Sequence, residues 1–414
     1  MDAPARARLL LLLPTTTYRA DAFVAAAKDL GWDLTVASEL PSSFQDQHPA
    51  DLITLPLDSP PAAAEKVRVF AQRYPLSAVV GVDDDTAVLA TILSQALGLP
   101  ANPLAAVEAA RSKARQRQVL CERGVPVPEF RLVALDGDPS QIAAKVPYPC
   151  VLKPIALSAS RGVIRANTSE EFAAAHSRLR SILETAGADD QEYLVERYVP
   201  GPEFALEGLL IDGALQVLAL FDKPDPLEGP YFEETIYVTP SRLSRPQQDR
   251  VVDCAQRAAA ALGLVQGPVH VELRLNDDGP WLIELAARPI GGKCGRVLRF
   301  GDRSQYSLEY VILGHATKTM IEVPPRESCA AGVMMIPTPT AGILEEVGGL
   351  EEARAQPGIE DVVITAHRGM ELVPLPEGSR YLGFIFARGE TPRQVEAALR
   401  RAHQQLDIRV GLTP

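Results

Sequence analysis

Two acidic residues on neighbouring short strands have the types and the spacing that could do chemistry. Glu272 lies in the apolar run Val269–Leu275 and Glu284 in the run Trp281–Leu285, with a turn-forming segment, Asn276–Gly279, between them. This pattern predicts a β-hairpin. Because side chains alternate between faces along a strand, both carboxylates are expected on one face, about 5 Å apart if they pair directly. Carboxylates this close repel unless a cation lies between them, and their oxygens suit Mg²⁺ that bridges substrate phosphates. Taken alone, the hairpin is equally well interpreted as a solvated turn with ordinary surface glutamates.

A second group of residues could bind an anion. The run Cys150–Pro154 is typical of a strand and carries one lysine, Lys153, whose buried ammonium would need a counter-charge such as a phosphate. The small residues of Ser158–Val163 follow, and a loop of this kind can turn backbone N–H groups toward an anion. Lys113 lies on a predicted helix among other basic residues, a pattern usually typical of a solvated face. Each of these signals is weak when it stands alone.

The first hundred residues alternate between predicted strands and helices. The predicted strands are Leu9–Leu13, Asp33–Ala37, Leu52–Leu55 and Ala78–Val82. The alternation indicates a parallel sheet flanked by helices. Asp83-Asp84-Asp85 follows the last strand, where such a sheet places its crevice, so these acids could line a site, although helix capping and solvation are the favoured interpretation. No GxGxxG follows the first strand, so the dinucleotide-binding fingerprint is absent.

The rest of the chain predicts three further domains after an N-terminal domain of residues 1–103. Residues 104–200 begin with one long helix, Ala105–Arg123, and include the lysine-bearing strand and the small-residue loop. Residues 201–327 include the hairpin and a Pro- and Gly-rich segment, Pro224–Phe232, that we expect to form a mobile loop over a site. Residues 328–414 change to short strands and a final helix. The predicted fold class is therefore a multidomain protein of α/β and α+β type.

Composition narrows the possible functions. The chain has 414 residues, 46% of them hydrophobic, and 41 basic against 53 acidic residues give a net charge of −12. This acidic balance gives no electrostatic footprint for nucleic acid, and no apolar run is long enough to span a bilayer. The five cysteines are scattered without a CxxC pair, which favours reduced thiols in a cytoplasmic protein over a disulfide framework or a zinc site.

Taken together, the order and spacing of these pieces resemble the ATP-grasp superfamily of carboxylate–amine ligases. The resemblance is greatest to the bacterial L-amino acid ligases that form dipeptides. It covers Arg111 to Gly292 by motif and nearly the whole chain by layout. It implies an ATP-grasp fold with an N-terminal parallel α/β domain, central ATP-binding subdomains and a C-terminal lid domain. It also implies amide-bond formation through an acyl phosphate, with release of ADP and phosphate, and it favours a homodimer.

The resemblance also implies a role for individual residues. Lys113 and Lys153 would hold the ATP phosphates, and Glu272 and Glu284 would carry two Mg²⁺ ions, with Mn²⁺ as an alternative. Arg288 would bind the carboxylate substrate and its phosphorylated form, which makes Lys153, Glu284 and Arg288 the catalytic residues. The other residues implied to contact ATP are those of the closing loop, the adenine hinge and the ribose acceptor: Ser158, Ser160, Gly162, Glu196, Tyr198, Val199 and Glu203.

The substrate residues are less sharply defined. The resemblance places Gly291, Gly292 and His270 near the substrate, although a packed, hydrogen-bonded histidine is at least as good an interpretation of His270. Glu233 or Glu234 could deprotonate the amine. The alternatives are an ATP-grasp enzyme that activates formate or bicarbonate, and an ATP-binding protein without catalysis.

Two features depart from the family pattern. Many members have Asn two residues after the second metal glutamate, where this chain has Ala286. The closing loop also contains less glycine than usual before its Ser-x-Gly-Val ending. Because Ala286 cannot bind a metal, one metal contact must come from water or substrate, or the second Mg²⁺ is held more weakly. The smaller glycine content puts the mobility of the closing loop in question, and its phosphate role is unaffected.

Overall fold

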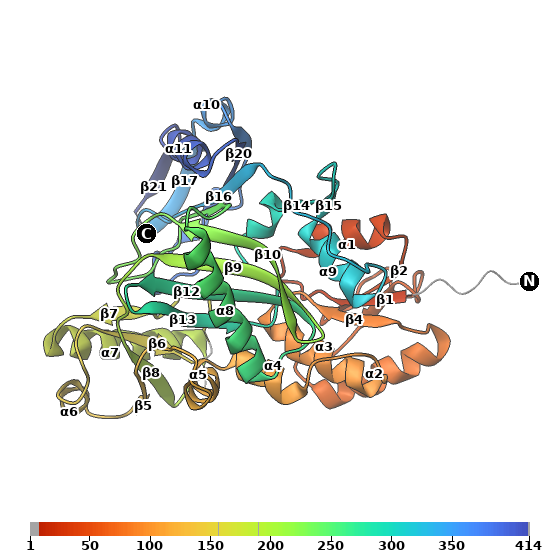
Figure 1. The fold of residues 1–414 in the computed structure, drawn as a ribbon, viewed down its shortest axis with the longest axis horizontal. Coiled ribbons are helices and arrows are strands. Elements are labelled where there is room, and N and C mark those ends of the chain that lie inside the picture. Colours follow the sequence, from red (N-terminus) through yellow and green to blue (C-terminus); the bar gives the residue numbers. More distant parts are fainter. Residues whose placement is uncertain (1–7, 156, 189, 413–414) are drawn as a thin grey trace, which may run out of the picture.

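The computed structural model describes residues 8–155, 157–188 and 190–412 (Figure 1). Residues 1–7 and 413–414, at the ends of the first and last predicted domains, lie outside the described residues. None of the helices in the described part of the chain combines the length and apolarity needed to cross a membrane.

The N-terminal domain is a four-stranded parallel sheet with helices on both faces, as predicted. The strands are β1 (Arg8–Leu12), β2 (Asp33–Ser38), β3 (Leu52–Thr54) and β4 (Ala78–Gly81), in the order β3-β2-β1-β4. The helices are α1 (Ala20–Asp29), α2 (Pro60–Arg73) and α3 (Asp84–Ala96). Along β1, Leu9 and Leu11 belong to the core cluster that includes α1, whereas Leu10 and Leu12 belong to the one that includes α2 and α3. Because both faces are covered, β1 is an unbroken apolar run.

The helix predicted over Ala105–Arg123 is two helices, so this prediction was wrong in one respect. α4 (Leu104–Arg111) ends before Ser112, and α5 (Lys113–Glu122) begins after it. Ser112 has an extended backbone (ψ 110°), and its side chain accepts a hydrogen bond from the N–H of Arg115. A serine in this position is a favourable N-cap, so the chain restarts a helix in a new direction.

A four-stranded antiparallel sheet follows, in the order β5-β8-β6-β7. Its strands and helices are β5 (Phe130–Ala134), α6 (Pro139–Ala143), β6 (Cys150–Pro154), β7 (Ile164–Ala166), α7 (Ser169–Ala186) and β8 (Glu192–Arg197). Its core includes Leu152 and Tyr193 from the strands and Phe172 and Leu179 from α7. The predicted strand Cys150–Pro154 is confirmed.

An eight-stranded sheet forms the centre of the molecule, with the order β13-β12-β9-β10-β11-β16-β20-β18. Its strands are β9 (Glu203–Ile211), β10 (Ala214–Lys223), β11 (Ile236–Thr239), β12 (Gly267–Asn276), β13 (Gly279–Ala286), β16 (Ala330–Ile336), β18 (Ile359–Ile364) and β20 (Gly383–Gly389). One face of β9 and β12 packs against α8 (Arg245–Leu262), which crosses these strands in Figure 1. β16 pairs with β11, so the sheet continues across the predicted domain boundary at residue 328.

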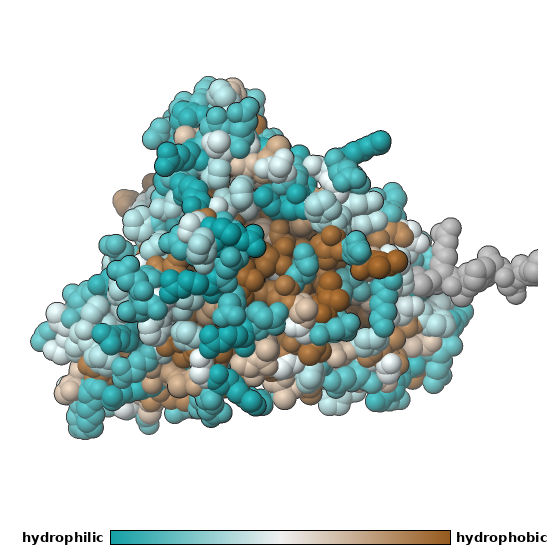
Figure 2. Space-filling model, viewed as in Figure 1, coloured by the Kyte–Doolittle hydropathy of each residue, from teal (hydrophilic) through white to brown (hydrophobic). Residues whose placement is uncertain are grey.

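The remaining elements pack around this sheet or form small sheets of their own. η1 (Cys294–Val297), β14 (Arg299–Phe300), β15 (Tyr306–Ser307) and α9 (Leu308–Ala316) connect it to the N-terminal domain, where α9 packs against α1. The C-terminal part adds α10 (Leu350–Arg354), α11 (Pro392–His403) and a small sheet of β17 (Gly342–Gly348), β19 (Glu371–Leu372) and β21 (Asp407–Gly411). Figure 2 shows that apolar surface gathers between α8 and α9 on the face in view.

Replacing Gly349 by alanine should destabilise the fold more than replacing Gly369. Both glycines have a left-handed φ, 74° and 84°, so either alanine should cost about 1–2 kcal/mol of backbone strain. A Cβ at Gly349 would also overlap the backbone of Gln405, whereas a Cβ at Gly369 would meet nothing within 4 Å. We expect Gly349→Ala to lose roughly 2 kcal/mol more than Gly369→Ala in urea denaturation. Equal losses for the two variants would contradict this packing.

Candidate active site

The two carboxylates of the β12–β13 hairpin lie on one face, as the sequence predicts. Glu272 and Glu284 are direct cross-strand partners, and a β-bulge follows Glu272. Both side chains line a cavity between the eight-stranded sheet and the four-stranded antiparallel sheet that contains β6 and β8. Their predicted placement is therefore confirmed, whereas their role as metal ligands stays a prediction.

The same cavity collects most of the residues expected to contact ATP. They come from α5, β6, the loop after β6, the end of β8 and the start of β9: Lys113, Lys153, Ser158, Ser160, Glu196, Tyr198, Val199 and Glu203. Glu234, expected near the substrate, also lines it. Residues as far apart in the chain as Lys113 and Glu284 thus share one space.

Alternation along two buried strands places polar side chains on one face of the sheet, where Glu203, Glu272 and Arg274 line this cavity. Glu203, Ala205 and Glu207 occupy every second position of β9, and His270, Glu272 and Arg274 do so on β12. The register pairs Glu203 with Arg274, Ala205 with Glu272, and Glu207 with His270. The residues between them, such as Phe204 and Val271, face the core under α8. A polar residue at every second position of an apolar strand is a signal that the sequence analysis did not use.

α5 fixes the strand that carries Glu284. β13 is the edge of its sheet, and the side chain of Gln116 pairs with both the N–H (3.0 Å) and the carbonyl (2.7 Å) of Leu285. One turn earlier on the helix, Lys113 donates to the Leu157 carbonyl (2.8 Å) and lies 3.6 Å from Glu284. Because residues three apart on a helix share a face, one helix covers the edge and brings an ammonium to the carboxylate.

Glu196 holds Lys153, one of the two lysines expected to bind phosphate, in place. One carboxylate oxygen accepts from Arg117 at 2.6 Å, and the other lies 2.7 Å from the Lys153 ammonium. Burial alone would raise the pKa of Glu196, but the two cations outweigh it and lower the pKa to about 2. The side chain of Glu196 is therefore committed to Arg117 and Lys153, and the hinge role expected for Glu196, Tyr198 and Val199 stays a prediction.

The loop after β6 has an unusual backbone. Ala159 (φ 55°), Ser160 (φ 56°) and Gly162 (φ 73°) are all left-handed. Two tight turns shape the loop, because the Arg161 N–H donates to the Ser158 carbonyl and the Val163 N–H to the Ser160 carbonyl. The C-terminal part of the chain holds this loop, because the Gly162 N–H donates to the Pro376 carbonyl and the Arg161 guanidinium to the Glu377 carbonyl, both at 2.9 Å.

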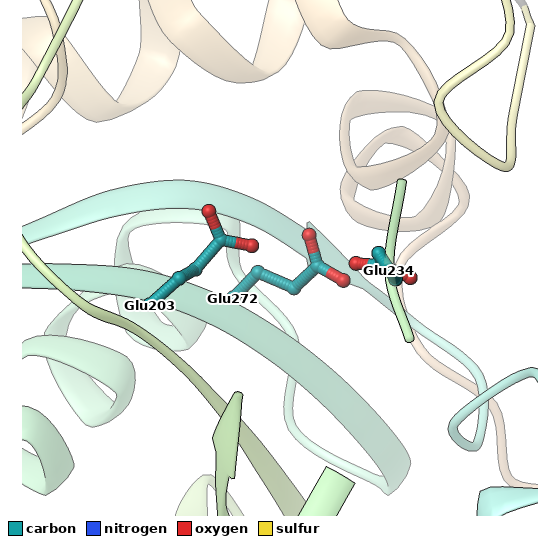
Figure 3. Close-up of side chains that lie close together, drawn as sticks. All are labelled: Glu203, Glu234 and Glu272. Atoms are coloured by element: carbon teal, nitrogen blue, oxygen red, sulfur yellow. The ribbon is translucent and has the colours of Figure 1, made fainter. Parts of the chain in front are cut away.

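A buried lysine that the sequence analysis missed lies at the centre of the site. The Lys223 ammonium is 2.7 Å from Glu203, 2.5 Å from Glu234 and 3.2 Å from Glu272. Figure 3 shows these three carboxylates turned toward one another, and an oxygen of each lies within 4.8 Å of the others. Burial alone would lower the pKa of Lys223, but the three carboxylates raise it well above its usual value.

The charge of this group is unbalanced. Three carboxylates face two cations, Lys223 and Arg274. Burial together with Glu272 and Glu203 raises the pKa of Glu234, although Lys223 opposes the shift. Hard oxygen donors with surplus negative charge fit Mg²⁺. Lys223 directly precedes a proline near the end of an apolar strand, as Lys153 does. The need of a buried ammonium for a counter-charge, which identified Lys153, applies equally to Lys223.

Arg274, also missed from the sequence, joins the hinge to the loop over the cavity. Its guanidinium donates to Glu203 and to the Val199 carbonyl, both at 2.9 Å, and to the Leu227 carbonyl. It lies over the rings of Tyr198 and Phe232. Leu227 and Phe232 line the cavity, so the segment Pro224–Phe232 does lie over the site; its mobility stays a prediction.

His270 lies between two carboxylates. Its Nε2 is 3.4 Å from Glu272 and its Nδ1 is 3.4 Å from Glu207, which is fully buried and accepts from the Ile290 N–H. Nδ1 has no aligned hydrogen bond among the described residues, although it lies close to Glu207. Burial alone would lower the pKa of His270, but the two carboxylates raise it. His270 is thus packed beside a cavity carboxylate without lining the cavity itself, and its role near the substrate stays a prediction.

The residues expected to bind the carboxylate substrate are held by the N-terminal domain. Arg288 does not line the cavity described above; it donates to Asp84 at 2.7 Å. The Gly292 N–H donates to the Tyr18 hydroxyl at 3.0 Å, and a Cβ at Gly291 would lie 3.5 Å from the same hydroxyl. Tyr18 lies in a segment from which the sequence analysis took no site residue.

Family comparisons agree with this arrangement. A model described as the ATP-grasp domain matches residues 146–297, one described as the ATP-grasp N-terminal domain matches residues 24–101, and one described as the L-amino acid ligase C-terminal domain 2 matches residues 334–411. The first contains the β12–β13 hairpin, and the third contains the segment that holds the loop after β6.

Individual proteins are similar over most or part of the chain. The solved L-amino acid ligase from Bacillus licheniformis superimposes with a TM-score of 0.79 at 26% identity, over 99% of this chain and all of that one. The uncharacterized protein y4rH of Sinorhizobium fredii is 28% identical over 75% of this chain and 63% of its own length. Carnosine synthase 1 of Gallus gallus is 34% identical over 50% of this chain and 24% of its own length. The chain therefore spans less than two thirds of these two relatives.

The Glu196 carboxylate should make folding stability depend on pH in the acid range. Its pKa is about 2 in the folded protein against 4.5 ordinarily, so its contribution is complete above pH 4.5 and is lost as the pH falls toward 2. The shift corresponds to roughly 3 kcal/mol. We expect Glu196→Gln to lower Tm at pH 7 and to flatten the fall of Tm between pH 4.5 and 2. Glu192→Gln, exposed on the same strand, is the matched control, and an equal acid dependence in both variants would contradict this pairing.

Proposed function

This chain belongs to the ATP-grasp superfamily, and we propose that it is an ATP-dependent carboxylate–amine ligase that joins an amino acid to an amine. One observation carries the proposal: one cavity brings the lysines expected to bind phosphate, Lys113 and Lys153, together with the paired carboxylates Glu272 and Glu284. The match of residues 334–411 to a domain of L-amino acid ligases favours an amino acid over formate or bicarbonate as the activated acid.

The chemistry requires an activated carboxylate. A carboxylate oxygen attacks the γ-phosphorus of ATP, the bond to the β,γ-bridging oxygen breaks, and an acyl phosphate and ADP form. The amine nitrogen then attacks the acyl carbon, the carbon–oxygen bond to phosphate breaks, and an amide and phosphate result. Phosphoryl transfer depends on positioning and on cations more than on covalent help from the protein.

The residues of the cavity fit these requirements. Lys113 and Lys153 would bind the phosphates, and Ser158 and Ser160, which line the same cavity, would contact them as well. Glu272 and Glu284 would hold Mg²⁺, for which we propose two ions, with Mn²⁺ as a substitute. When bound, Mg²⁺ neutralises charge on the phosphates. Since Ala286 offers no oxygen side chain, the second ion would depend on Glu284 and on substrate or water oxygens.

The amine must lose a proton as the amide forms. Glu234 lines the cavity whereas Glu233 does not, so we propose Glu234 as the acceptor. Burial and neighbouring carboxylates raise the pKa of Glu234, which brings it nearer to neutral pH and makes it a better base. Water must also be kept from the acyl phosphate, which the loop around Leu227 and Phe232 would do by covering the cavity.

Two further properties complete the proposal. We propose a homodimer, supported by the apolar surface between α8 and α9, because large exposed apolar patches commonly mark interfaces (Figure 2). Light scattering would test it, since a dimer has twice the mass of the 44.6 kDa chain.

We also propose that the protein acts in the cytoplasm, supported by five cysteines that are all free thiols.

The ligase proposal predicts that ATP turnover needs two substrates. The purified protein would be incubated with Mg²⁺, ATP and pairs of amino acids, with phosphate release as the readout and mass spectrometry of the product. We expect phosphate and an amide product only when the acid and the amine are both present. ATP binding without any product across the panel would contradict the proposal and leave a non-catalytic nucleotide-binding protein.

Removing one carboxylate of the hairpin should abolish turnover without unfolding the protein. We expect Glu272→Gln and Glu284→Gln each to lower kcat at least ~100-fold, because each variant removes a ligand of the metal that offsets phosphate charge. Asp277→Asn, exposed at the tip of the same hairpin, should leave kcat unchanged. Undiminished ligation by Glu284→Gln would disprove the assigned metal role.

A further inference from the structure

The start of α3 places three consecutive carboxylates in three different environments. Asp83 caps the helix, because its side chain accepts from the Thr86 N–H at 3.0 Å. Asp85 is exposed and pairs with Arg111 at 2.9 Å. Asp84 instead contacts Arg288, 204 residues further along the chain and in another domain. The capping interpretation of this segment therefore holds for Asp83 and does not account for Asp84.

The contact leaves part of the Arg288 guanidinium free. Asp84 accepts from Nε at 2.7 Å, and the Pro289 carbonyl accepts from Nη1 at 3.0 Å. Among the described residues, Nη2 has no hydrogen-bond partner, although the Arg288 side chain is only 16% exposed. A guanidinium is a rigid planar fork, so fixing Nε fixes the direction of the remaining donors.

The backbone after Arg288 is fixed separately. The Arg19 guanidinium donates to the carbonyls of Pro289 and Ile290, at 3.1 and 2.6 Å, and Glu207 accepts from the Ile290 N–H at 3.1 Å. These contacts set the path of the main chain but do not touch the Arg288 side chain. Among the residues that the structure describes, Asp84 is the one whose carboxylate forms an ion pair with the Arg288 guanidinium.

The pair is charged at neutral pH. Burial alone would raise the pKa of Asp84, but Arg288 outweighs this effect and lowers it. Burial would likewise lower the pKa of Arg288, and Asp84 raises it instead. The contact between them is thus a charge-assisted hydrogen bond, which is shorter and more directional than a neutral one.

We propose that Asp84 is a positioning residue that aims the free donors of Arg288 at the carboxylate of the acid substrate. This inference rests on the ligase function proposed above. It makes the N-terminal domain part of the active site, since the residue that orients the substrate-binding arginine lies at the carboxyl end of a strand of that domain.

Steady-state kinetics of Asp84→Ala, Asp84→Asn and Asp85→Ala test the inference. For Asp84→Ala we expect kcat/KM for the acid substrate to fall roughly 10- to 100-fold, with KM for ATP within twofold of wild type. Asp84→Asn keeps an acceptor for Nε without the charge and should lie in between. Asp85→Ala, the neighbouring ion pair, should match wild type. Kinetics of Asp84→Ala equal to those of Asp85→Ala, or a parallel rise of both KM values, would overturn the inference.

A double-mutant comparison shows whether Asp84 acts through Arg288. In an Arg288→Lys background, which lacks the fork, Asp84→Ala should lower kcat/KM less than threefold further, because coupled residues are not additive. An unchanged 10- to 100-fold loss in that background would overturn the inference.

Chemical labelling separates this inference from the ligase proposal. Phenylglyoxal modifies accessible guanidinium groups, and mass spectrometry can follow Arg288 without any substrate. We expect Arg288 to react several-fold faster in Asp84→Ala than in wild type and Asp85→Ala. Equal labelling rates would overturn the pairing even in an active ligase, whereas a wild-type protein that makes no amide but shows the rate difference would disprove the ligase proposal alone.

Discussion

The need to balance buried carboxylates is the constraint on which this structure depends. Glu196, Glu203 and Glu272 lie in one cavity between two sheets, where an unpaired charge would be costly. Lysine or arginine side chains within 3.2 Å compensate each of them, and these cations come from α5, β6, β10 and β12. Most of these partners come from neighbouring strands of the same sheet, and Arg117 of α5 adds a cation from outside the sheet of Glu196. The compensation is incomplete around Lys223, and that surplus negative charge is what suits the site to a divalent cation.

The site is also supported at an edge that would otherwise be exposed. β13 carries Glu284 on the outer strand of an eight-stranded sheet, and such edges present unpaired backbone groups. Gln116 satisfies the backbone of Leu285 as a neighbouring strand would, and Arg117 donates to the Ile283 carbonyl while it also binds Glu196. α5 therefore covers the exposed edge of β13 and also contacts two cavity carboxylates, Glu196 and Glu284. The break at Ser112 matters for this reason, since it sets the direction in which α5 begins.

The N-terminal domain and the C-terminal part of the chain each hold a segment that carries candidate site residues. The N-terminal domain holds the segment from Arg288 to Gly292 through Asp84, Arg19 and Tyr18. The C-terminal part holds the loop after β6 at Gly162. The cavity is thus a property of the assembled domains, because neither the phosphate-binding candidates nor the substrate-binding candidates are fixed by one domain alone.

The sequence by itself determined the local features of this protein. A turn between two apolar runs, a lysine in an apolar strand and the alternation of strands and helices depend on neighbouring residues, so they predicted the pairing of Glu272 with Glu284, the strand of Lys153 and the parallel N-terminal sheet. Only the tertiary structure decided which charges meet. Glu196 finds Arg117 and Lys153, Lys223 finds three carboxylates, and Asp84 finds Arg288 across 204 residues. The physical reason is that the partner of a buried charge is set by which strands and helices pack together, and residue spacing along one segment carries no information about that packing.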